Sequence, residues 1–346
     1  MKIAQAAAAA LSIGLVLATV ACSSDSSGTD TSSPSAVATT ASPDDDATAD
    51  DPDDSAEDDA TDDGGSTDAV ARHIAQQLST DWKQPVIVDN RPGASGMIGT
   101  EVAVHAPSDG YTALFAITQN IQNPLLYPKA SYDFGRDFVP VARILTVASG
   151  LAVSADLPVS SLKQLVELIR SQPGQHSYGS TGIGSTAHIY GALFDKTAVL
   201  DAVHSPYRGA GPMLADLLGR RITFTVMDVG SLMPHVKAGK LRILAVTGTR
   251  RLAALDSVPT FAEAGMKGFE ALAWMGIALP ASTPEAMRKT WGAALEKYLN
   301  SGDFASTLAS IGLTPSYLGP QEFAAQIVQD TAVWRTIITT ANVRAE

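Results

Sequence analysis

The segment of this chain best suited to binding a ligand is a loop of glycines and hydroxyl residues, Tyr178-Gly-Ser-Thr-Gly-Ile-Gly-Ser-Thr-Ala-His188. Glycine lets the backbone turn tightly and approach a ligand closely, because it has no Cβ. Apolar residues with helical spacing follow, so Ser185 or Thr186 is placed to cap a helix whose first amides face the loop. Such a helix start binds anions without any lysine or arginine. The loop therefore predicts a site for a small carboxylate or phosphate.

Two other interpretations fit the same residues. A Gly/Ser-rich stretch is often no more than a connection with a helix cap. Gly182-x-Gly184-x-x-Ala187 also matches the dinucleotide-binding fingerprint, and Asp201 lies near the expected acidic position. However, residues 176–179, just before the loop, are too short and polar for the apolar first strand of a dinucleotide-binding unit. The dinucleotide interpretation is therefore disfavoured.

Residues 1–22 have the features of an export signal. Lys2 lies near the start, an apolar run extends from Ala6 to Leu17, and small residues lead to Cys22. The run is shorter than the roughly 20 residues that span a membrane. Cys22 is the only cysteine, so an internal disulfide is excluded. The stretch that ends at Cys22 resembles a bacterial lipobox, which predicts a lipid anchor at the outer face of the cell membrane; a plain secretory signal is the alternative.

Residues 23–65 form an acidic segment with 14 of the chain's 36 Asp and Glu residues and neither Lys nor Arg. Such a segment cannot bury a core, so we expect a disordered tether between the anchor and a folded body. Calcium binding is the alternative use of its carboxylates. The rest of the chain is close to neutral, so the net charge of −12 says nothing about the ligand. We expect neither a metal site, since the six His are scattered, nor nucleic-acid binding, since no basic stripe is present.

Short apolar strand candidates alternate with helical stretches from Thr67 to the end of the chain. Extended segments are expected at 85–88, 110–117, 144–153, 222–227 and 241–247, and helices at 69–78, 162–171, 212–218, 284–299, 304–311 and 320–340. This alternation indicates an α/β fold with largely parallel sheets. The length is sufficient for two lobes.

Several motifs, taken in order along the chain, resemble one protein family. They are Val86-Ile-Val-Asp-Asn-Arg-Pro-Gly-Ala-Ser-Gly96, Pro107-Ser-Asp-Gly-Tyr-Thr112, Tyr132-Asp-Phe-Gly-Arg-Asp-Phe138, the loop at 179–188, Pro206-Tyr-Arg-Gly209, Ala245-Val-Thr247, Val258-Pro-Thr-Phe-Ala-Glu-Ala-Gly265, Trp274-Met-Gly276 and Pro280-Ala-Ser-Thr-Pro284. From about Gly64 onward, the chain is similar to the Bug/TctC group, the extracytoplasmic substrate-binding proteins of tripartite tricarboxylate transporters.

That resemblance implies a two-lobed periplasmic-binding-protein (type II) fold, with parallel-rich sheets joined by two hinge strands. Lobe one would comprise residues 66–148 with 275–346, and lobe two residues 149–274. The resemblance also implies a monomer without a cofactor or a catalytic site. Such a protein captures a di- or tricarboxylate, or a similar organic acid, and delivers it to the membrane subunits of a transporter. Closure of the two lobes would enclose the ligand.

The resemblance also places ligand-binding residues in both lobes. The family motifs match Ser180, Gly182, Gly184, Ser185 and Thr186 in the carboxylate loop of lobe two, and Ser66, Thr67 and the Asp68 backbone in the matching loop of lobe one. By their positions, Thr118 and Gln119 at the end of a strand and Tyr207 and Asp228 after strand-like segments of lobe two are further candidates, with a structural role as the alternative for each of these four. His188 also matches the loop motif, and it is equally suited to a structural hydrogen bond.

One departure from the family concerns the first strand of lobe one. Family members have an apolar strand just before the Gly-Gly-x-Thr-Asp loop, whereas residues 50–63 of this chain are rich in aspartate. A buried strand cannot form from them. We therefore expect lobe one to lack a central strand, with the backbone groups of the neighbouring strands left to find other partners.

Other functions stay open at this point. A lipoprotein that binds a ligand for a signalling partner would have the same sequence features. A hydrolase would pair His188 or His204 with a serine, but no Gly-x-Ser-x-Gly elbow and no third orienting group are recognisable. An exported lipoprotein rarely meets a reduced cofactor, which disfavours a dinucleotide-dependent enzyme. The favoured hypothesis is a solute-binding lipoprotein for a tripartite tricarboxylate transporter.

Overall fold

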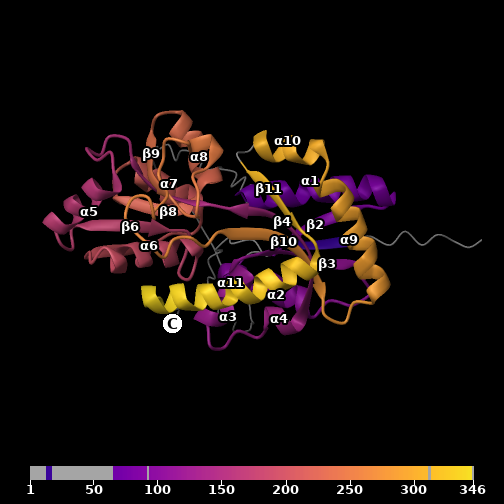
Figure 1. Cartoon of the computed structure of the whole chain (residues 1–346). Coiled ribbons are helices and arrows are strands. Elements are labelled where there is room, and N and C mark those ends of the chain that lie inside the picture. The colour runs from indigo at the N-terminus through magenta and orange to yellow at the C-terminus, as the bar shows by residue number, and fades with distance from the viewer. Residues whose placement is uncertain (1–12, 18–64, 92, 311–312, 345–346) are drawn as a thin grey trace, which may run out of the picture.

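The computed structural model describes residues 13–17, 65–91, 93–310 and 313–344, and its strands form two sheets (Figure 1). The first sheet contains, in spatial order, β11 (Thr314–Leu318), β4 (Phe138–Val147), β10 (Ala273–Pro280), β3 (Thr112–Ile117), β1 (Ile13–Leu17) and β2 (Val86–Asn90). The second contains β7 (Ala202–Pro206), β6 (His176–Ser180), β8 (Phe224–Asp228), β5 (Ser149–Ser154) and β9 (Leu241–Val246). Each sheet with its helices forms one lobe, called lobe one and lobe two in this order.

Both sheets are mixed, with parallel and antiparallel pairs in each, and they form the expected two-lobed α/β fold. In lobe one, β1 pairs in parallel with β2 and β3, whereas β10 is antiparallel to β3 and β4. In lobe two, β6 pairs in parallel with β7 and β8, whereas β5 is antiparallel to β8 and β9. The reversal has a simple origin. β5 and β10 are the first strands after the chain passes from one sheet to the other. Each therefore enters its sheet at the end that faces the other lobe and runs opposite to its neighbours.

The chain passes between the sheets twice, as the two-lobed fold requires. β4 ends at Val147 and β5 begins at Ser149, so only Ala148 separates them. The return runs from β9 through residues 247–272 to β10. Beside this return, Trp274 donates its backbone N–H to the Thr118 hydroxyl at 2.6 Å, and the Thr118 N–H donates to the Trp274 carbonyl at 3.2 Å. These bonds tie the end of β3 to the second passage between the lobes.

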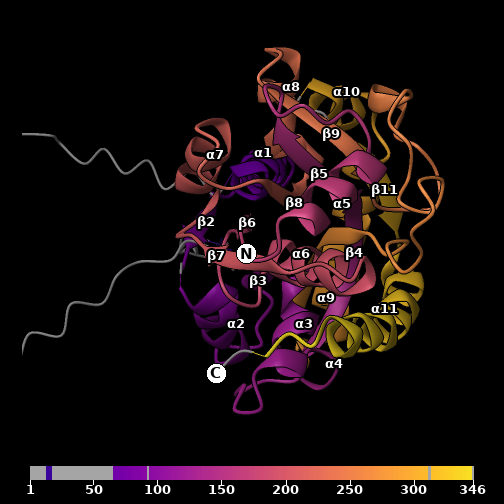
Figure 2. The same ribbon diagram turned by 90° about the vertical axis from the view of Figure 1, so that its left-hand side faces the viewer.

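Helices cover the faces of both sheets. Lobe one carries α1 (Gly65–Trp82), α2 (Met97–Val104), α3 (Gln119–Leu126), α4 (Phe134–Asp137), α9 (Glu285–Leu299), α10 (Gly302–Ser310) and α11 (Pro320–Ala341). Lobe two carries α5 (Leu162–Ser171), α6 (Thr186–Thr197), α7 (Ala210–Leu218) and α8 (Val229–Lys237). The long α11 contacts both β4 of lobe one and α6 of lobe two (Figures 1 and 2). The C-terminal helix therefore braces the two lobes against each other.

The central position expected to be vacant in lobe one is occupied. Ile13–Leu17 lies between β2 and β3, with Ile13 opposite Val86 and Leu15 opposite Ala113. The run is rich in apolar residues, including isoleucine and valine, as expected for a strand paired on both edges. The expectation of a missing strand is therefore wrong, because part of the apolar run assigned to the export signal supplies it. The acidic tether and Cys22 lie outside the described residues.

Strand β6 is not among the extended segments expected from the sequence, and its residues are mostly polar. It lies between β7 and β8, which both supply backbone hydrogen-bond partners. Its Gly179 is also required by the packing, because a Cβ at this position would lie 2.4 Å from Ile222 Cδ1 and 2.7 Å from Met213 Cγ. Neighbouring strands and close packing, rather than its own composition, therefore make this segment a strand.

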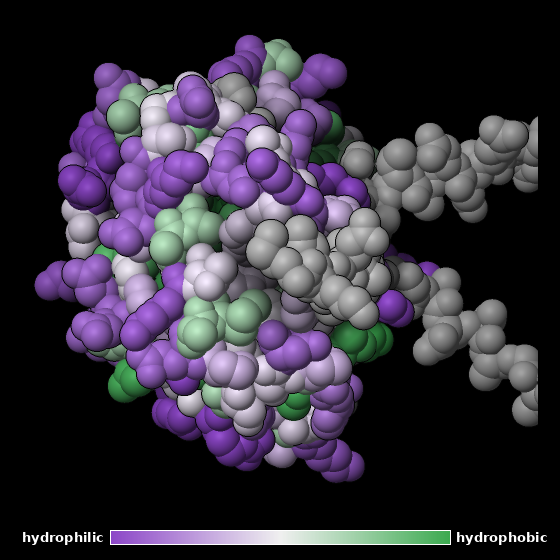
Figure 3. Space-filling model, turned by 90° about the vertical axis from the view of Figure 1, so that its right-hand side faces the viewer, coloured by the Kyte–Doolittle hydropathy of each residue, from purple (hydrophilic) through white to green (hydrophobic). Residues whose placement is uncertain are grey.

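The apolar residues that indicated the elements form the cores of both lobes. Phe115, Ile277 and Trp291 are buried in lobe one, and Phe194 and Phe224 in lobe two. The surface at the lobe-one end is mostly hydrophilic, with scattered apolar residues (Figure 3). Within the described part of the chain, none of the helices is both long and apolar enough to cross a bilayer.

Candidate ligand-binding site

The carboxylate loop, defined here as residues 180–186, begins at the carboxyl end of β6 and leads directly into α6. Gly182 and Gly184 have φ angles of 140° and 78°, which side-chain-bearing residues rarely adopt. The cap of α6 is Ser185, whose hydroxyl accepts a hydrogen bond from the backbone N–H of His188 at 3.2 Å. The alternation of glycine and serine therefore encodes a tight turn followed by a capped helix start.

Two side chains, one buried and one half-buried, hold the loop from within lobe two. The fully buried Ser180 donates its hydroxyl proton to the Gly182 carbonyl at 3.1 Å and lies 2.7 Å from Nε2 of His204. The Gly184 N–H donates to Nδ1 of His188 at 3.1 Å. The side chains of Ser180 and His188 thus shape the loop, and the Thr186 hydroxyl contacts the opposite lobe.

Lobe one closes onto this loop through three hydrogen bonds. The Ile183 carbonyl accepts from the hydroxyls of Ser95 and Tyr127, each at 3.2 Å. The Thr186 hydroxyl donates to Oε1 of Gln122 at 3.1 Å. Because Ser95, Gln122 and Tyr127 belong to lobe one, these contacts describe a closed arrangement of the lobes.

Two glutamine amides at the start of α3 have no protein partner. The side chains of Gln119 and Gln122 are 8% and 0% exposed, and Nε2 of each is buried without a hydrogen-bond acceptor. Leaving such a donor unsatisfied costs about 1–3 kcal/mol. Both amides are therefore donors that a ligand or a water molecule would satisfy. The sequence pointed to Gln119 and missed Gln122, although a spacing of three residues places both on one helical face.

Asp228 and Tyr207, also predicted as site residues, follow strands adjacent to β6. Asp228 caps α8, and its Oδ1 accepts from the Ser231 N–H at 2.8 Å. Burial raises the pKa of its carboxyl group. Tyr207 donates its backbone N–H to the Ser180 carbonyl at 2.9 Å, but its hydroxyl donates to Asp216 at 2.7 Å. Asp228 thus lies at the same sheet edge as the loop, whereas the Tyr207 hydroxyl is held by α7.

The predicted residues of lobe one lie in helix starts rather than in a loop. Thr67 and Asp68 belong to the first turn of α1, where the Asp68 carboxylate accepts from Arg72 Nε at 2.6 Å and from Asn90 Nδ2 at 2.9 Å. Thr118 is 2% exposed, and its hydroxyl binds the backbone at Trp274. That hydroxyl therefore ties the hinge region together. The side chain of Ser66 lies outside what the structure describes.

The fold and this site together define a class of protein. Two mixed sheets joined by two passages, with a glycine-rich loop where the two lobes meet, are the architecture of a periplasmic binding protein. Residues 70–343 match the model of the tripartite tricarboxylate transporter family receptor, TctC, and the chain belongs to this family. The family consists of solute receptors and not of enzymes. Among the residues that the structure describes, no group of His, Cys, Asp and Glu is arranged to hold a metal ion.

Individual relatives support the same assignment. A protein encoded between tcbD and tcbE in a Pseudomonas species is 35% identical over 271 residues, which cover 78% of this chain and 81% of the relative. An R. palustris protein solved with adipate is 33% identical, with a TM-score of 0.76 over 81% of this chain and 94% of its own. The periplasmic binding protein BugD is 27% identical, with a TM-score of 0.75 and coverages of 82% and 95%. MatC from Rhodopseudomonas palustris, solved with malate, is 25% identical, with a TM-score of 0.72 and coverages of 80% and 95%.

Proposed function

We propose that this protein is an exported receptor that captures a small dicarboxylate, or a similar organic acid, and delivers it to the membrane subunits of a tripartite tricarboxylate transporter. The observation that carries the proposal is the carboxylate loop, whose glycine-rich turn and capped helix start close against α3 of the opposite lobe. Relatives solved with adipate and with malate show that this family accommodates dicarboxylates.

In the proposed complex, one ligand carboxylate lies at the start of α6, where the first backbone amides have no partner within the helix. The positive end of the helix dipole stabilises this negative charge without a cationic side chain. The orphan amides of Gln119 and Gln122 would donate to the other end of the ligand. The first turn of α1, with Ser66, Thr67 and Asp68, and the cap residue Asp228 complete the proposed surroundings. Neutral donors on both sides suit a ligand that is recognised by shape as well as by charge.

The experiment that tests this proposal is isothermal titration calorimetry with adipate, malate and citrate, and with adipamide as a neutral analogue of adipate. We expect one of the acids to bind and adipamide to fail, because the amide lacks the charge that the helix start stabilises. At 100 times its Kd, the bound acid should add about 2.7 kcal/mol to the free energy of unfolding. Binding of adipamide as tightly as adipate, or of none of the three acids, would contradict the proposal.

Delivery to a transporter needs a separate test, because a sensor would bind the same acids. The expected result is that cells which lack this receptor, but retain the membrane subunits, lose uptake of the labelled acid. Unchanged uptake in such cells would favour the signalling alternative.

We also propose that Cys22 is the attachment point of a lipid anchor. Cleavage before Cys22 would separate Ile13–Leu17 from the rest of the chain, so the anchored form and the form with β1 are different molecules. Mass spectrometry of the protein from bacterial membranes distinguishes them. A diacylated peptide that begins at Cys22 supports the anchor, whereas an unmodified peptide that spans residues 13–22 contradicts it.

A further inference from the structure

Two histidine rings lie directly behind the carboxylate loop. His188, in the first turn of α6, and His204, in β7, stack face to face, with ring centroids 3.8 Å apart and ring planes within 4° of parallel. The ring of Tyr178 in β6 stacks on His204 with a centroid distance of 5.0 Å. Three rings from three different elements therefore form one stack next to the loop.

Each histidine makes one hydrogen bond to the loop, and these bonds define where the ring protons lie. Nδ1 of His188 accepts from the Gly184 N–H, so this nitrogen carries no proton. Ser180 uses its own proton to bind the Gly182 carbonyl, so its oxygen accepts the N–H at Nε2 of His204. The ring of His188 is therefore neutral in this arrangement, with its proton on Nε2, and His204 also carries a proton on Nε2.

A positive charge on His188 is incompatible with this arrangement, because Nδ1 would then carry a proton. Burial lowers the pKa of His188 to about 4 and that of His204 to about 4, and the neighbouring His188 adds to the effect on His204. Two charged rings at this spacing would repel each other strongly. A proton on Nδ1 of His188 would also remove the only acceptor recorded for the Gly184 N–H.

We propose that His188 and His204 are positioning residues, which hold the carboxylate loop in its ligand-binding shape as a neutral stacked pair. His188 fixes the amide of Gly184, and His204 fixes the hydroxyl of Ser180. The proposal rests on the function proposed above for the loop. Protonation of His188 releases the Gly184 amide, so the receptor loses its ligand in acid for a reason that lies in the protein and not in the ligand.

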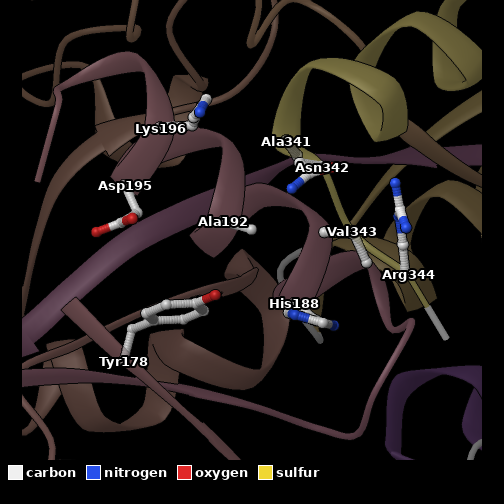
Figure 4. Close-up of a pocket in the computed structure, with 9 residues that line it drawn as sticks. All are labelled: Tyr178, His188, Ala192, Asp195, Lys196, Ala341, Asn342, Val343 and Arg344. Carbon is white, nitrogen blue, oxygen red and sulfur yellow. The ribbon is translucent and has the colours of Figure 1, made fainter. Parts of the chain in front are cut away.

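His188 lines a pocket of about 420 Å³ between α6 and the end of α11, together with charged residues (Figure 4). Asp195 and Lys196 line it from α6, Arg344 from the segment after α11, and Tyr178 from β6. Lys196 and Arg344 are exposed cations that oppose protonation of the ring. The Asp195 carboxylate favours it, but this group accepts the Ala202 N–H at 2.9 Å, and burial raises its own pKa. The surroundings therefore leave the neutral form favoured.

A matched pair of variants at position 188 tests the role of the ring. In His188→Asn, the side-chain oxygen lies near the place of Nδ1, so it accepts the Gly184 N–H but does not titrate. In His188→Leu, the volume is similar and the acceptor is lost. We expect His188→Asn to bind adipate about as tightly as the parent at pH 7 and to keep that affinity to lower pH. We expect His188→Leu to bind about five- to tenfold more weakly at every pH, as the loss of one hydrogen bond predicts.

The measurement is the Kd of adipate, or of malate if adipate does not bind, at steps from pH 7 to pH 4. Both variants and the parent meet the same ligand protonation at each pH, so differences between their profiles report the protein alone. Far-ultraviolet circular dichroism confirms that each variant is folded. Identical pH profiles for the parent and His188→Asn, or unweakened binding by His188→Leu, would overturn the proposal.

A second measurement needs no ligand and separates this inference from the proposed function. Long-range proton–nitrogen NMR spectra of histidine-labelled protein report the tautomer of each ring. We expect the Nε2–H form for both rings at pH 7, with titration only in acid. If this is observed and no acid binds, then the proposed function fails while the role of the pair in the loop stands. A proton on Nδ1 of His188 would overturn the inference directly.

Discussion

The hydroxyl of Thr186 lies 3.1 Å from Oε1 of Gln122, and this hydrogen bond joins the start of α6 to the first turn of α3 in the opposite lobe. The same Gln122 presents an amide nitrogen that has no protein acceptor. One side chain thus contributes both to closure of the lobes and to the polar lining between them. Ligand binding and closure are therefore expected to be coupled through this residue.

Replacing Thr186 with valine should weaken ligand binding about fivefold, because it removes one cross-lobe hydrogen bond at nearly constant volume. The loss should lie in faster dissociation, since the bond forms only when the lobes are closed. Stopped-flow displacement measures the dissociation rate. Thr336→Val is the matched control, because the Thr336 hydroxyl binds only the carbonyl of Ala332 within α11. Equal dissociation rates for Thr186→Val and the parent would contradict this role of the hydroxyl.

Gly184→Ala should lower the affinity by more than tenfold. The φ of 78° costs a side-chain-bearing residue about 1–2 kcal/mol, and the added Cβ would lie 3.1 Å from the Tyr127 hydroxyl of the opposite lobe. Gly239→Ala is the control, because Gly239 has a similar φ of 69° but no atom within 4 Å of the added Cβ. Both variants should lose stability in thermal unfolding, and only Gly184→Ala should lose affinity. Similar losses of affinity in both variants would attribute the loss to backbone strain and would contradict a role of the position of Gly184 in the site.

Stability should fall between pH 6.5 and pH 4. The pKa values of His188 and His204 are lowered to about 4, so the unfolded chain binds more protons than the folded one in this range. The contribution of these rings is complete above the unfolded pKa and is lost as the pH falls toward the folded value. Raised pKa values of Asp195 and Asp228 act in the opposite direction. Thermal midpoints of the parent and of His188→Asn isolate the histidine contribution, and we expect a shallower pH dependence for the variant.

Strand β1 should be required for a stable lobe one. Leu15→Pro removes a backbone donor from a strand that is paired on both sides, which should cost about 3 kcal/mol. Leu15→Val keeps the donor and the strand propensity, so it should have little effect. Hydrogen exchange of β2 and β3 in the full chain is the measurement. Unchanged protection of Val86–Asn90 in Leu15→Pro would show that the pairing of β1 does not hold this part of the sheet.

The parts of the site that depend on local backbone demands could be predicted from the sequence. The positive φ of Gly182 and Gly184 and the cap at Ser185 need only neighbouring residues, and the loop with its helix follows from them. Contacts between distant segments could not be predicted in this way. His204 reaches Ser180 across 24 residues, and Gln122 reaches Thr186 across 64. Such pairs arise from the topology of the sheets and leave no periodic signal.

The strands show the same limit. β6 has little strand character of its own, and two neighbouring strands supply its hydrogen bonds. Ile13–Leu17 shows the opposite case, because one apolar run satisfies the requirements of an export signal and also those of a central strand. Composition alone cannot distinguish these uses, since both require a short apolar segment.

The position of β1 has a consequence for how this receptor matures. Because β1 lies between β2 and β3, a cut after Leu17 that removed β1 would leave these two strands without the strand that joins them. A peptidase acting before Cys22 would thus remove five residues from the interior of a sheet as well as a leader. If Cys22 is the anchor proposed above, then maturation and completion of the fold would compete for the same stretch of chain. The order of these two events during export would determine which form of the receptor meets the transporter.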